Sequence, residues 1–133
     1  MELTRKAEYA IRGMLYLTRQ QEGNISMLVD IAGTVEAPKT FLAKIFQELV
    51  KTGLIKSTRG VKGGFVLARP PERITLREIV EAIEGPIMPN KCLMGEGVCS
   101  FQNTCPVHPV WRRLQAVTKG ILDEVTLKTL SAG

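Results

Sequence analysis

The sequence of 133 residues lacks the long apolar runs of a membrane protein. No stretch of about 18 consecutive apolar residues is present, which is the length a helix needs to span a bilayer. The chain begins Met-Glu-Leu-Thr-Arg-Lys, without the apolar segment of a signal peptide. We therefore expect a soluble protein of the cytoplasm that has no membrane partner.

Residue sets for catalysis are also scarce. Histidine occurs once, so a Ser-His-Asp set would depend on a single candidate. No Cys-x-x-Cys pair occurs, and no phosphate-binding glycine loop precedes a predicted helix. The sequence therefore predicts that the chain is not an enzyme, and a thiol-based or metal-dependent enzyme is the disfavoured alternative.

Aromatic residues make up only 5% of the chain, but its 44% hydrophobic and 23% charged residues are typical of an ordinary folded protein. A chain of this length is long enough for one compact domain plus an appended helix, and too short for two full domains. We expect a single core.

Apolar residues recur at three- and four-residue steps in three stretches of the N-terminal half, which predicts helices over about 4–20, 27–34 and 38–53. Thr4 suits the N-cap of the first helix. Pro38 suits the first turn of the third, and Gly53 suits its C-cap. Two short helices joined by a tight turn are typical of a helix-turn-helix motif.

A different pattern follows the third helix. Residues 54–57 and 65–68 resemble two strands, and the glycine-rich segment between them predicts a tight turn. A β-hairpin beside a helix-turn-helix is the wing of a winged helix. Thr75 and Glu78 then form a predicted capping box, which begins a short helix that ends near Glu84.

Positive charge is concentrated in the predicted recognition helix and wing. Residues 38–73 contain eight Lys and Arg against two Glu, a local charge of +6, so the remainder of the +5 chain sums to −1. A clustered basic patch favours a polyanionic partner, because phosphates interact with Lys and Arg held on one face. A solvated basic face that binds nothing is the alternative.

An α-helix fits the major groove of DNA, where its exposed polar side chains can contact base edges. The outward polar positions of the third helix are Lys39, Thr40, Lys44, Gln47 and Lys51. At the wing tip the candidates are Arg59, Gly60 and Lys62, which could approach phosphates or a groove. Arg59 is the preferred contact, and the minor groove is one place where it could bind. The tip glycines have a second explanation in the tight turn itself. A winged helix that binds only protein is a further alternative, and it predicts no salt-sensitive DNA binding.

All three cysteines, Cys92, Cys99 and Cys105, lie within 14 residues of a predicted loop, and His108 follows closely. In a reducing compartment this clustering favours metal or redox chemistry over structural disulfides. Thiolates are good ligands for iron–sulfur clusters and for zinc, although zinc sites favour closer cysteine pairs. His108 or a carboxylate of a partner subunit could complete the site. A thiol switch without a metal is the remaining possibility.

The C-terminal part predicts one helix, from about Val110 to near Leu130, with an apolar stripe at Val110, Leu114, Val117, Ile121 and Val125. Such a stripe needs a partner surface, which predicts a homodimer; packing back on the chain's own domain is the alternative. The predicted fold class is therefore mainly α with a small β-hairpin. Its divisions are a winged helix-turn-helix domain over 1–84, a cysteine loop over 85–109 and a dimerisation helix over 110–133.

These motifs together resemble the IscR- and NsrR-like family of bacterial winged-helix regulators with an iron–sulfur cluster. The resemblance covers nearly the whole chain. It is carried by Leu3-Thr4-x-Lys6-x-x-Tyr9-Ala10, Phe41-Leu42-x-x-Ile45-Phe46, Ser57-x-Arg59-Gly60-x-x-Gly63-Gly64-Phe65-x-Leu67, the three cysteines, and Cys105-x-x-His108-x-x-Trp111-Arg112.

The resemblance implies a bacterial homodimeric repressor that binds a palindromic operator in double-stranded DNA. It implies a cluster that senses iron–sulfur status, redox state or nitric oxide, [2Fe-2S] in preference to [4Fe-4S]. The implied ligands are Cys92, Cys99, Cys105 and His108, and Glu8 from the partner subunit is the alternative fourth ligand. Two positions depart from the family pattern: the first cysteine gap is one residue longer, and Ala43 replaces a glutamate that helps IscR-like proteins discriminate operators.

Overall fold

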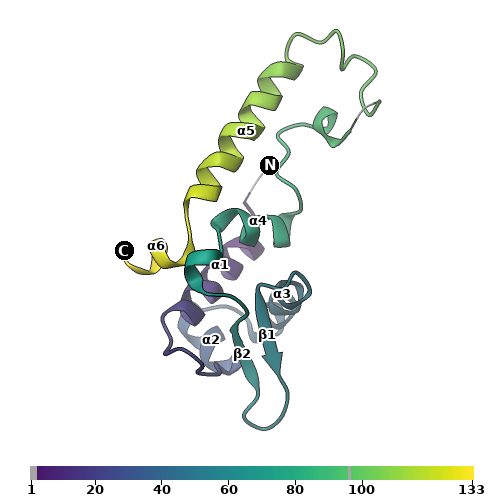
Figure 1. Ribbon diagram of the computed structural model, residues 1–133. Helices are drawn as coiled ribbons and strands as arrows, with labels where there is room; N and C mark the ends of the chain where they lie inside the picture. The colour runs from purple at the N-terminus through teal and green to yellow at the C-terminus, as the bar shows by residue number, and fades with distance from the viewer. Residues whose placement is uncertain (1–2, 96) are drawn as a thin grey trace.

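A computed structural model describes residues 3–95 and 97–133. Its elements confirm a mainly α fold with one antiparallel hairpin (Figure 1). In chain order they are α1 (Arg5–Thr18), α2 (Leu28–Val35), α3 (Lys39–Lys51), β1 (Ile55–Thr58), β2 (Gly64–Leu67), the single turn η1 (Pro71–Arg73), α4 (Leu76–Glu84), the turn η2 (Lys91–Met94), α5 (His108–Glu124) and α6 (Leu127–Ser131).

The helix boundaries follow the local signals in the sequence. The Thr4 hydroxyl accepts a hydrogen bond from the Ala7 N–H at 3.3 Å and caps α1. Thr75 and Glu78 form the predicted capping box of α4, with both reciprocal hydrogen bonds present. Gly53 follows the end of α3 with φ near +80°, a conformation that disfavours residues with a Cβ.

One hydrophobic core joins helices α1 to α4, helix α6 and the hairpin. Phe46 of α3 lies at its centre, fully buried, and its ring meets Phe65 of β2 edge-on with centroids 5.0 Å apart. Gly13 of α1 faces the same ring, and a Cβ there would collide with it. The core therefore fixes α3 against α1 and the wing.

The hairpin is a short, tight wing. Ile55 pairs with Leu67 and Thr58 with Gly64, and residues 59–63 form the turn. A Cβ on Gly63 would collide with the Thr58 carbonyl oxygen, and one on Gly64 with the carbonyl of Ser26, which pairs with Phe65. These two glycines are thus required by close backbone approach alone, with or without DNA.

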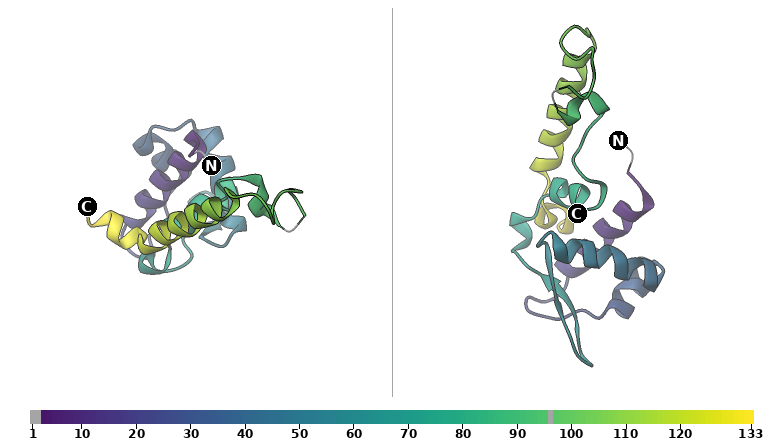
Figure 2. Two further views of the ribbon diagram at one scale, coloured as in Figure 1. Left: turned by 90° about the horizontal axis from the view of Figure 1, so that it is seen from above. Right: turned by 90° about the vertical axis from the view of Figure 1, so that its right-hand side faces the viewer.

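The C-terminal half forms an arm. Helix α5 projects from the winged helix, and the cysteine-containing segment lies at its far end (Figures 1 and 2). Across the part of the chain that the structure describes, every helix is too short or too polar to cross a bilayer.

The prediction of one terminal helix running to near Leu130 is wrong at its C-terminal end. Helix α5 ends at Glu124, and Val125 has an extended backbone. The Leu76 N–H donates to the Val125 carbonyl at 2.8 Å, and the Leu127 N–H donates to the Ile74 carbonyl at 3.0 Å. This pairing replaces the next helical turn. Helix α6 then begins at a Thr126 cap and buries Leu127 completely in the core of the winged helix.

Candidate DNA-binding face and cysteine pocket

Helix α3 separates its polar and apolar residues cleanly. Its buried residues Leu42, Ile45, Phe46 and Leu49 face the core. The five predicted contact residues are all exposed: Lys39, Thr40, Lys44, Gln47 and Lys51. At about 100° per residue they fall within an arc of about 140°, opposite the buried side. The structure thus brings them together on one open face.

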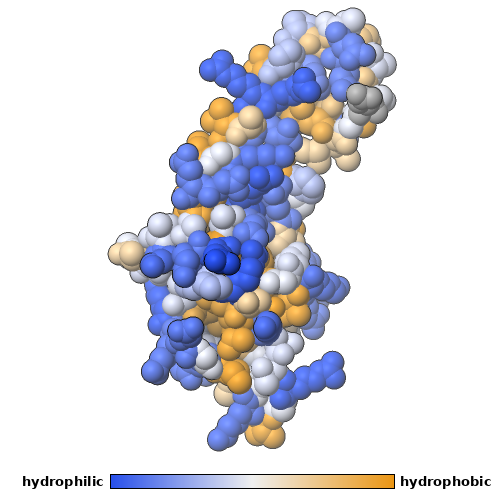
Figure 3. All heavy atoms as spheres, viewed as in Figure 1, coloured by the Kyte–Doolittle hydropathy of each residue, from blue (hydrophilic) through white to orange (hydrophobic). Residues whose placement is uncertain are grey.

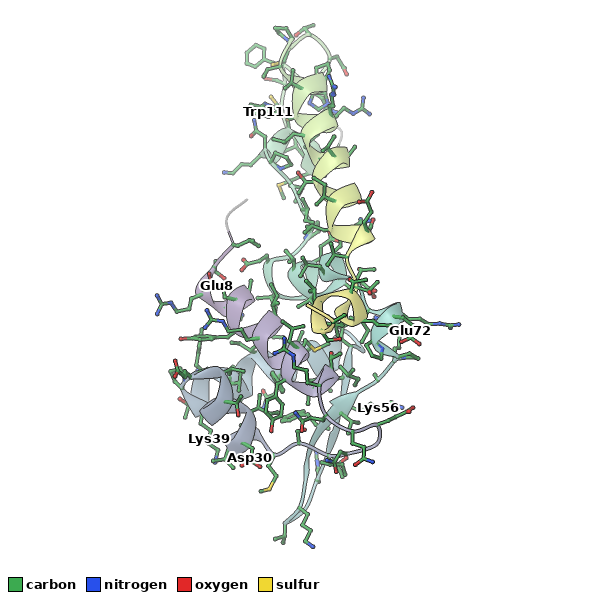
Figure 4. All side chains as sticks on the ribbon, turned by 90° about the vertical axis from the view of Figure 1, so that its left-hand side faces the viewer. Glu8, Asp30, Lys39, Lys56, Glu72 and Trp111 are labelled. Carbon is green, nitrogen blue, oxygen red and sulfur yellow. The ribbon has the colours of Figure 1, made fainter. Side chains whose placement is uncertain are left out.

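The wing extends beside this face. Arg59, Gly60 and Lys62 are exposed in the turn, and Gly60 has φ near +117°. Lys39, at the start of α3, lies on the same lower part of the molecule as the wing (Figure 4). We refer to the five cations Lys39, Lys44, Lys51, Arg59 and Lys62, together with Thr40, Gln47 and Gly60, as the basic face.

The cations of the basic face form no ion pair with any carboxylate in residues 3–95 and 97–133. Neighbouring cations differ in this respect. Lys6 of α1 contacts Glu48 of α3 at 2.6 Å, and Arg69 contacts Glu78 at 2.5 Å. The basic face therefore keeps its charge available, as a surface that binds phosphates requires.

The four predicted ligand residues lie around one pocket of about 200 Å³ at the far end of the arm. Cys92 lies on the turn η2 and His108 is the first residue of α5; both are buried. Cys99 and Cys105 lie on the loop between them and are partly exposed. All three cysteines are free thiols. The fold therefore collects side chains that are up to 16 residues apart in sequence.

Within this pocket the buried pair is in direct contact, with the Nδ1 atom of His108 3.1 Å from the sulfur of Cys92. The loop turns tightly beside it, because the Cys105 N–H donates to the Phe101 carbonyl at 2.7 Å. No three Cys, His, Asp or Glu side chains in the described ranges are close enough together to hold a single metal ion.

Several residues that line the pocket could not be identified as site residues from the sequence pattern. Lys91, Val98, Gln102 and Val107 also line the pocket, as does Trp111, which entered only through the family motif. The Oε1 atom of Gln102 is buried and has no hydrogen-bond partner in the described structure. Soft sulfur ligands and a largely apolar wall suit a bound group with thiolate-coordinated iron and its own sulfur atoms.

Glu8, the alternative ligand, lies elsewhere. It is exposed on α1 in the body of the winged helix, whereas Trp111 of the pocket lies on the arm (Figure 4). Glu8 is not among the residues that line the pocket of its own chain. A role for Glu8 as ligand therefore requires a second subunit.

The apolar stripe of α5 is exposed along most of its length. Val110, Leu114, Val117 and Ile121 are 46–59% exposed, and apolar surface is visible along the arm in Figure 3. At about 100° per residue the four fall within an arc of about 60°. Val125, the fifth predicted member, lies outside the helix and is partly buried.

A winged helix with an open cationic recognition helix and wing defines a class, the DNA-binding transcription regulators. The chain belongs to the Rrf2 family, described as iron-dependent transcriptional regulators, whose sequence profile matches residues 3–133. Its members are regulators and not enzymes, as the sequence predicts. The predicted likeness to IscR-type proteins is confirmed by the relatives.

Two curated relatives are similar over almost the full chain. An HTH-type transcriptional regulator of Mycobacterium tuberculosis is 33% identical over 100% of this chain and 83% of its own length. The HTH-type transcriptional regulator IscR of Escherichia coli is 32% identical over 98% of this chain and 80% of its own length. Among solved structures, CymR, the global cysteine regulator of Bacillus subtilis, superimposes with a TM-score of 0.79 at 29% identity, covering 99% of this chain and 97% of its own.

Proposed function

We propose that this protein is a homodimeric repressor of the bacterial cytoplasm whose affinity for a palindromic operator is set by an iron–sulfur cluster. The observation that carries the proposal is the single pocket lined by all three cysteines and the only histidine of the chain. Cys92, Cys99, Cys105 and His108 would hold the cluster, with [2Fe-2S] preferred over [4Fe-4S]. When bound, such a cluster supplies a centre that reacts with oxidants and nitric oxide.

The geometry of the basic face supports a role in DNA binding. Thr40, Lys44 and Gln47 are exposed on one side of α3, where a helix in the major groove meets base edges. Arg59 and Lys62 on the wing would contact phosphates or the minor groove. The winged helix over 1–84 would thus be the DNA-binding domain and 85–109 the cluster-binding loop.

Dimerisation would use the exposed stripe of α5, within the division 110–133. A helix-turn-helix monomer covers half a site, and two-fold symmetric dimers match palindromic DNA. The stripe is supported as an interface because four large apolar side chains are exposed side by side on one helix face. Helix α6 takes no part, since it packs on its own winged helix.

A cluster-free regulator is the second candidate. The structural likeness to a global cysteine regulator favours it, and so does the partial exposure of Cys99 and Cys105. In that case the cysteines would act as a thiol switch or bind zinc. Neither a disulfide nor zinc absorbs visible light, so colour separates the two candidates.

The deciding experiment is purification of the full chain without oxygen, followed by a visible absorption spectrum and assays of iron and sulfide. We expect a coloured protein that loses both its colour and its iron in Cys99→Ala. Ser100→Ala is the matched control, because it changes the neighbouring exposed residue and removes no ligand. A colourless, iron-free wild-type protein from iron-replete cells would overturn the cluster and leave the cluster-free regulator.

A further inference from the structure

A continuous set of polar contacts joins α4 of the winged helix to α5 of the arm. It consists of Arg77, Glu81, Gln115, Asp123 and the peptide groups of Ile87, and we refer to it as the α4–α5 bridge. Arg77 donates to Glu81 at 2.8 Å and to Asp123 at 2.9 Å. The Ile87 N–H donates to Glu81 at 3.0 Å, and the Gln115 amide donates to the Ile87 carbonyl at 2.8 Å.

Glu81 is the central residue of the bridge. One carboxylate oxygen accepts from Arg77 and the other accepts from the Ile87 peptide, so both are occupied. Its side chain is 25% exposed, less than that of Arg77 or Asp123. Hydrogen bonds to Asp123 and then Glu81 raise the pKa of Arg77 above its ordinary value, so the guanidinium stays charged. Charge-assisted bonds of this kind are stronger and more directional than neutral ones.

The bridge holds α5 at two points. Gln115 and Asp123 are eight residues apart, which is about 12 Å along a helix. Two contacts at this separation oppose tilting of α5, where one contact would leave it free to pivot. Neither attachment could be predicted from the sequence, because Gln115 and Asp123 lie 28 and 46 residues from their partners.

The bridge also lies between the two candidate sites. Helix α4 packs against α1 and α3, and so contacts the element that carries the recognition residues. On the other side, Ile87 is buried five residues before Cys92, and Gln115 is two helical turns after His108. A movement of the cysteine loop would therefore displace Ile87, which contacts Glu81, and a movement of α5 would displace Asp123, which contacts Arg77.

We propose that the α4–α5 bridge couples the state of the cysteine pocket to the DNA-binding face, with Glu81 as its main positioning residue. This inference rests on the proposed function, since it needs two states of the pocket that bind DNA differently. Without the bridge, the backbone pairing of Val125 and Leu127 with the winged helix would hold α5 only at its C-terminal end. Rearrangement at the far end of the arm would then tilt α5 about that end and leave the spacing of two recognition helices unchanged. With the bridge in place, the same rearrangement moves the winged helix.

The test measures how strongly the state of the cysteine pocket changes the affinity for DNA, and not the affinity for DNA alone. The DNA is a duplex selected by the wild-type protein from a random pool. Its Kd is measured for full-length protein reconstituted without oxygen with ferrous iron and sulfide, and again after a chelator has removed the iron. The ratio of the two Kd values is the coupling, which in allosteric proteins is about 5- to 150-fold. Glu81→Gln keeps the shape of the side chain but removes its charge and one of its two acceptors.

We expect Glu81→Gln and Asp123→Asn each to bring the ratio to within about twofold of one, well below the usual range of coupling. Asp123 is 46% exposed, so we expect its variant to fold even if the other does not. Glu78→Gln is the matched control on the same helix. It breaks an ion pair with Arg69 that stays inside the winged helix, and the ratio should keep its wild-type value.

Three other outcomes would overturn the inference. A wild-type ratio of one would defeat the proposed cluster control and, with it, the coupling. A wild-type ratio that persists in Glu81→Gln and Asp123→Asn would defeat the bridge alone and leave the proposed function intact. An equal loss in Glu78→Gln would show that any weakening of α4 has the same effect, which a merely structural role predicts.

Discussion

Replacing Arg59 by alanine tests whether the wing contacts DNA. Arg59 is exposed in the wing turn and has no carboxylate partner within residues 3–95 and 97–133, so its removal leaves no buried charge behind. The wing geometry depends on the close approaches of Gly63 and Gly64 and should persist. The loss can thus be attributed to the missing cation.

The size of the effect follows from the charge of the basic face. Each phosphate contact contributes about 0.9 to the slope of log K against log salt concentration. The five cations of the basic face in one protomer would give ten in a dimer, and a slope of about −9 if all of them contact phosphates. Arg59→Ala removes one cation from each protomer, so we expect the slope to become shallower by about 1.8.

The assay is a DNA titration by fluorescence anisotropy at several salt concentrations, with a selected duplex and an unrelated one. Arg59→Ala should weaken binding to both duplexes. Arg113→Ala removes an arginine that is also exposed, on α5 and away from the basic face, and should leave the slope unchanged. Equal effects of the two substitutions would refute the reasoning and place the wing away from DNA.

Three further predictions concern assembly and stability. Leu114→Glu places a charge in the exposed stripe of α5 and should convert the dimer to a monomer in sedimentation or light scattering; a dimer that survives would remove α5 from the interface. Leu127→Ala should lower the free energy of unfolding in urea by about 2–5 kcal/mol because its side chain is fully buried, whereas Leu130→Ala should lower it less. Burial alone would raise the pKa of Glu78, but hydrogen bonds from Arg69 and Thr75 lower it below 4.5. Glu78→Gln should therefore reduce stability at neutral pH, and the difference from wild type should disappear as the pH falls through the lowered pKa; a difference independent of pH would contradict this.

Local signals predicted the winged helix well. The spacing of buried residues along α1 and α3, the Thr4 and Thr75 caps and the glycines of the wing each act within a few residues of chain, so they can be recognised without the fold. The end of α5 could not be recognised in this way. Its last apolar positions continue the helical pattern, but backbone pairing of 125–127 with 74–76 competes with the next turn.

The candidate site also has features that could be predicted from the sequence and features that could not. Clustering of Cys92, Cys99, Cys105 and His108 predicted a ligand set, because the residue types and their proximity along the chain are sufficient for that. The sequence could not predict that Gln102 would enter the same pocket with an unsatisfied oxygen. That placement depends on how the loop turns over α5.

By itself the sequence determined the class of protein, since helical periodicity, caps, turn glycines, clustered cations and clustered thiols are all local properties. Only the tertiary structure decided how the two ends of the molecule are connected. Glu81 is unremarkable in sequence, and its i,i+4 partner Arg77 could have been predicted. The links from Arg77 to Asp123 and from Gln115 to Ile87, in contrast, exist only because α5 packs across α4. Contacts between distant segments depend on the packing of whole elements, which no short window of sequence contains.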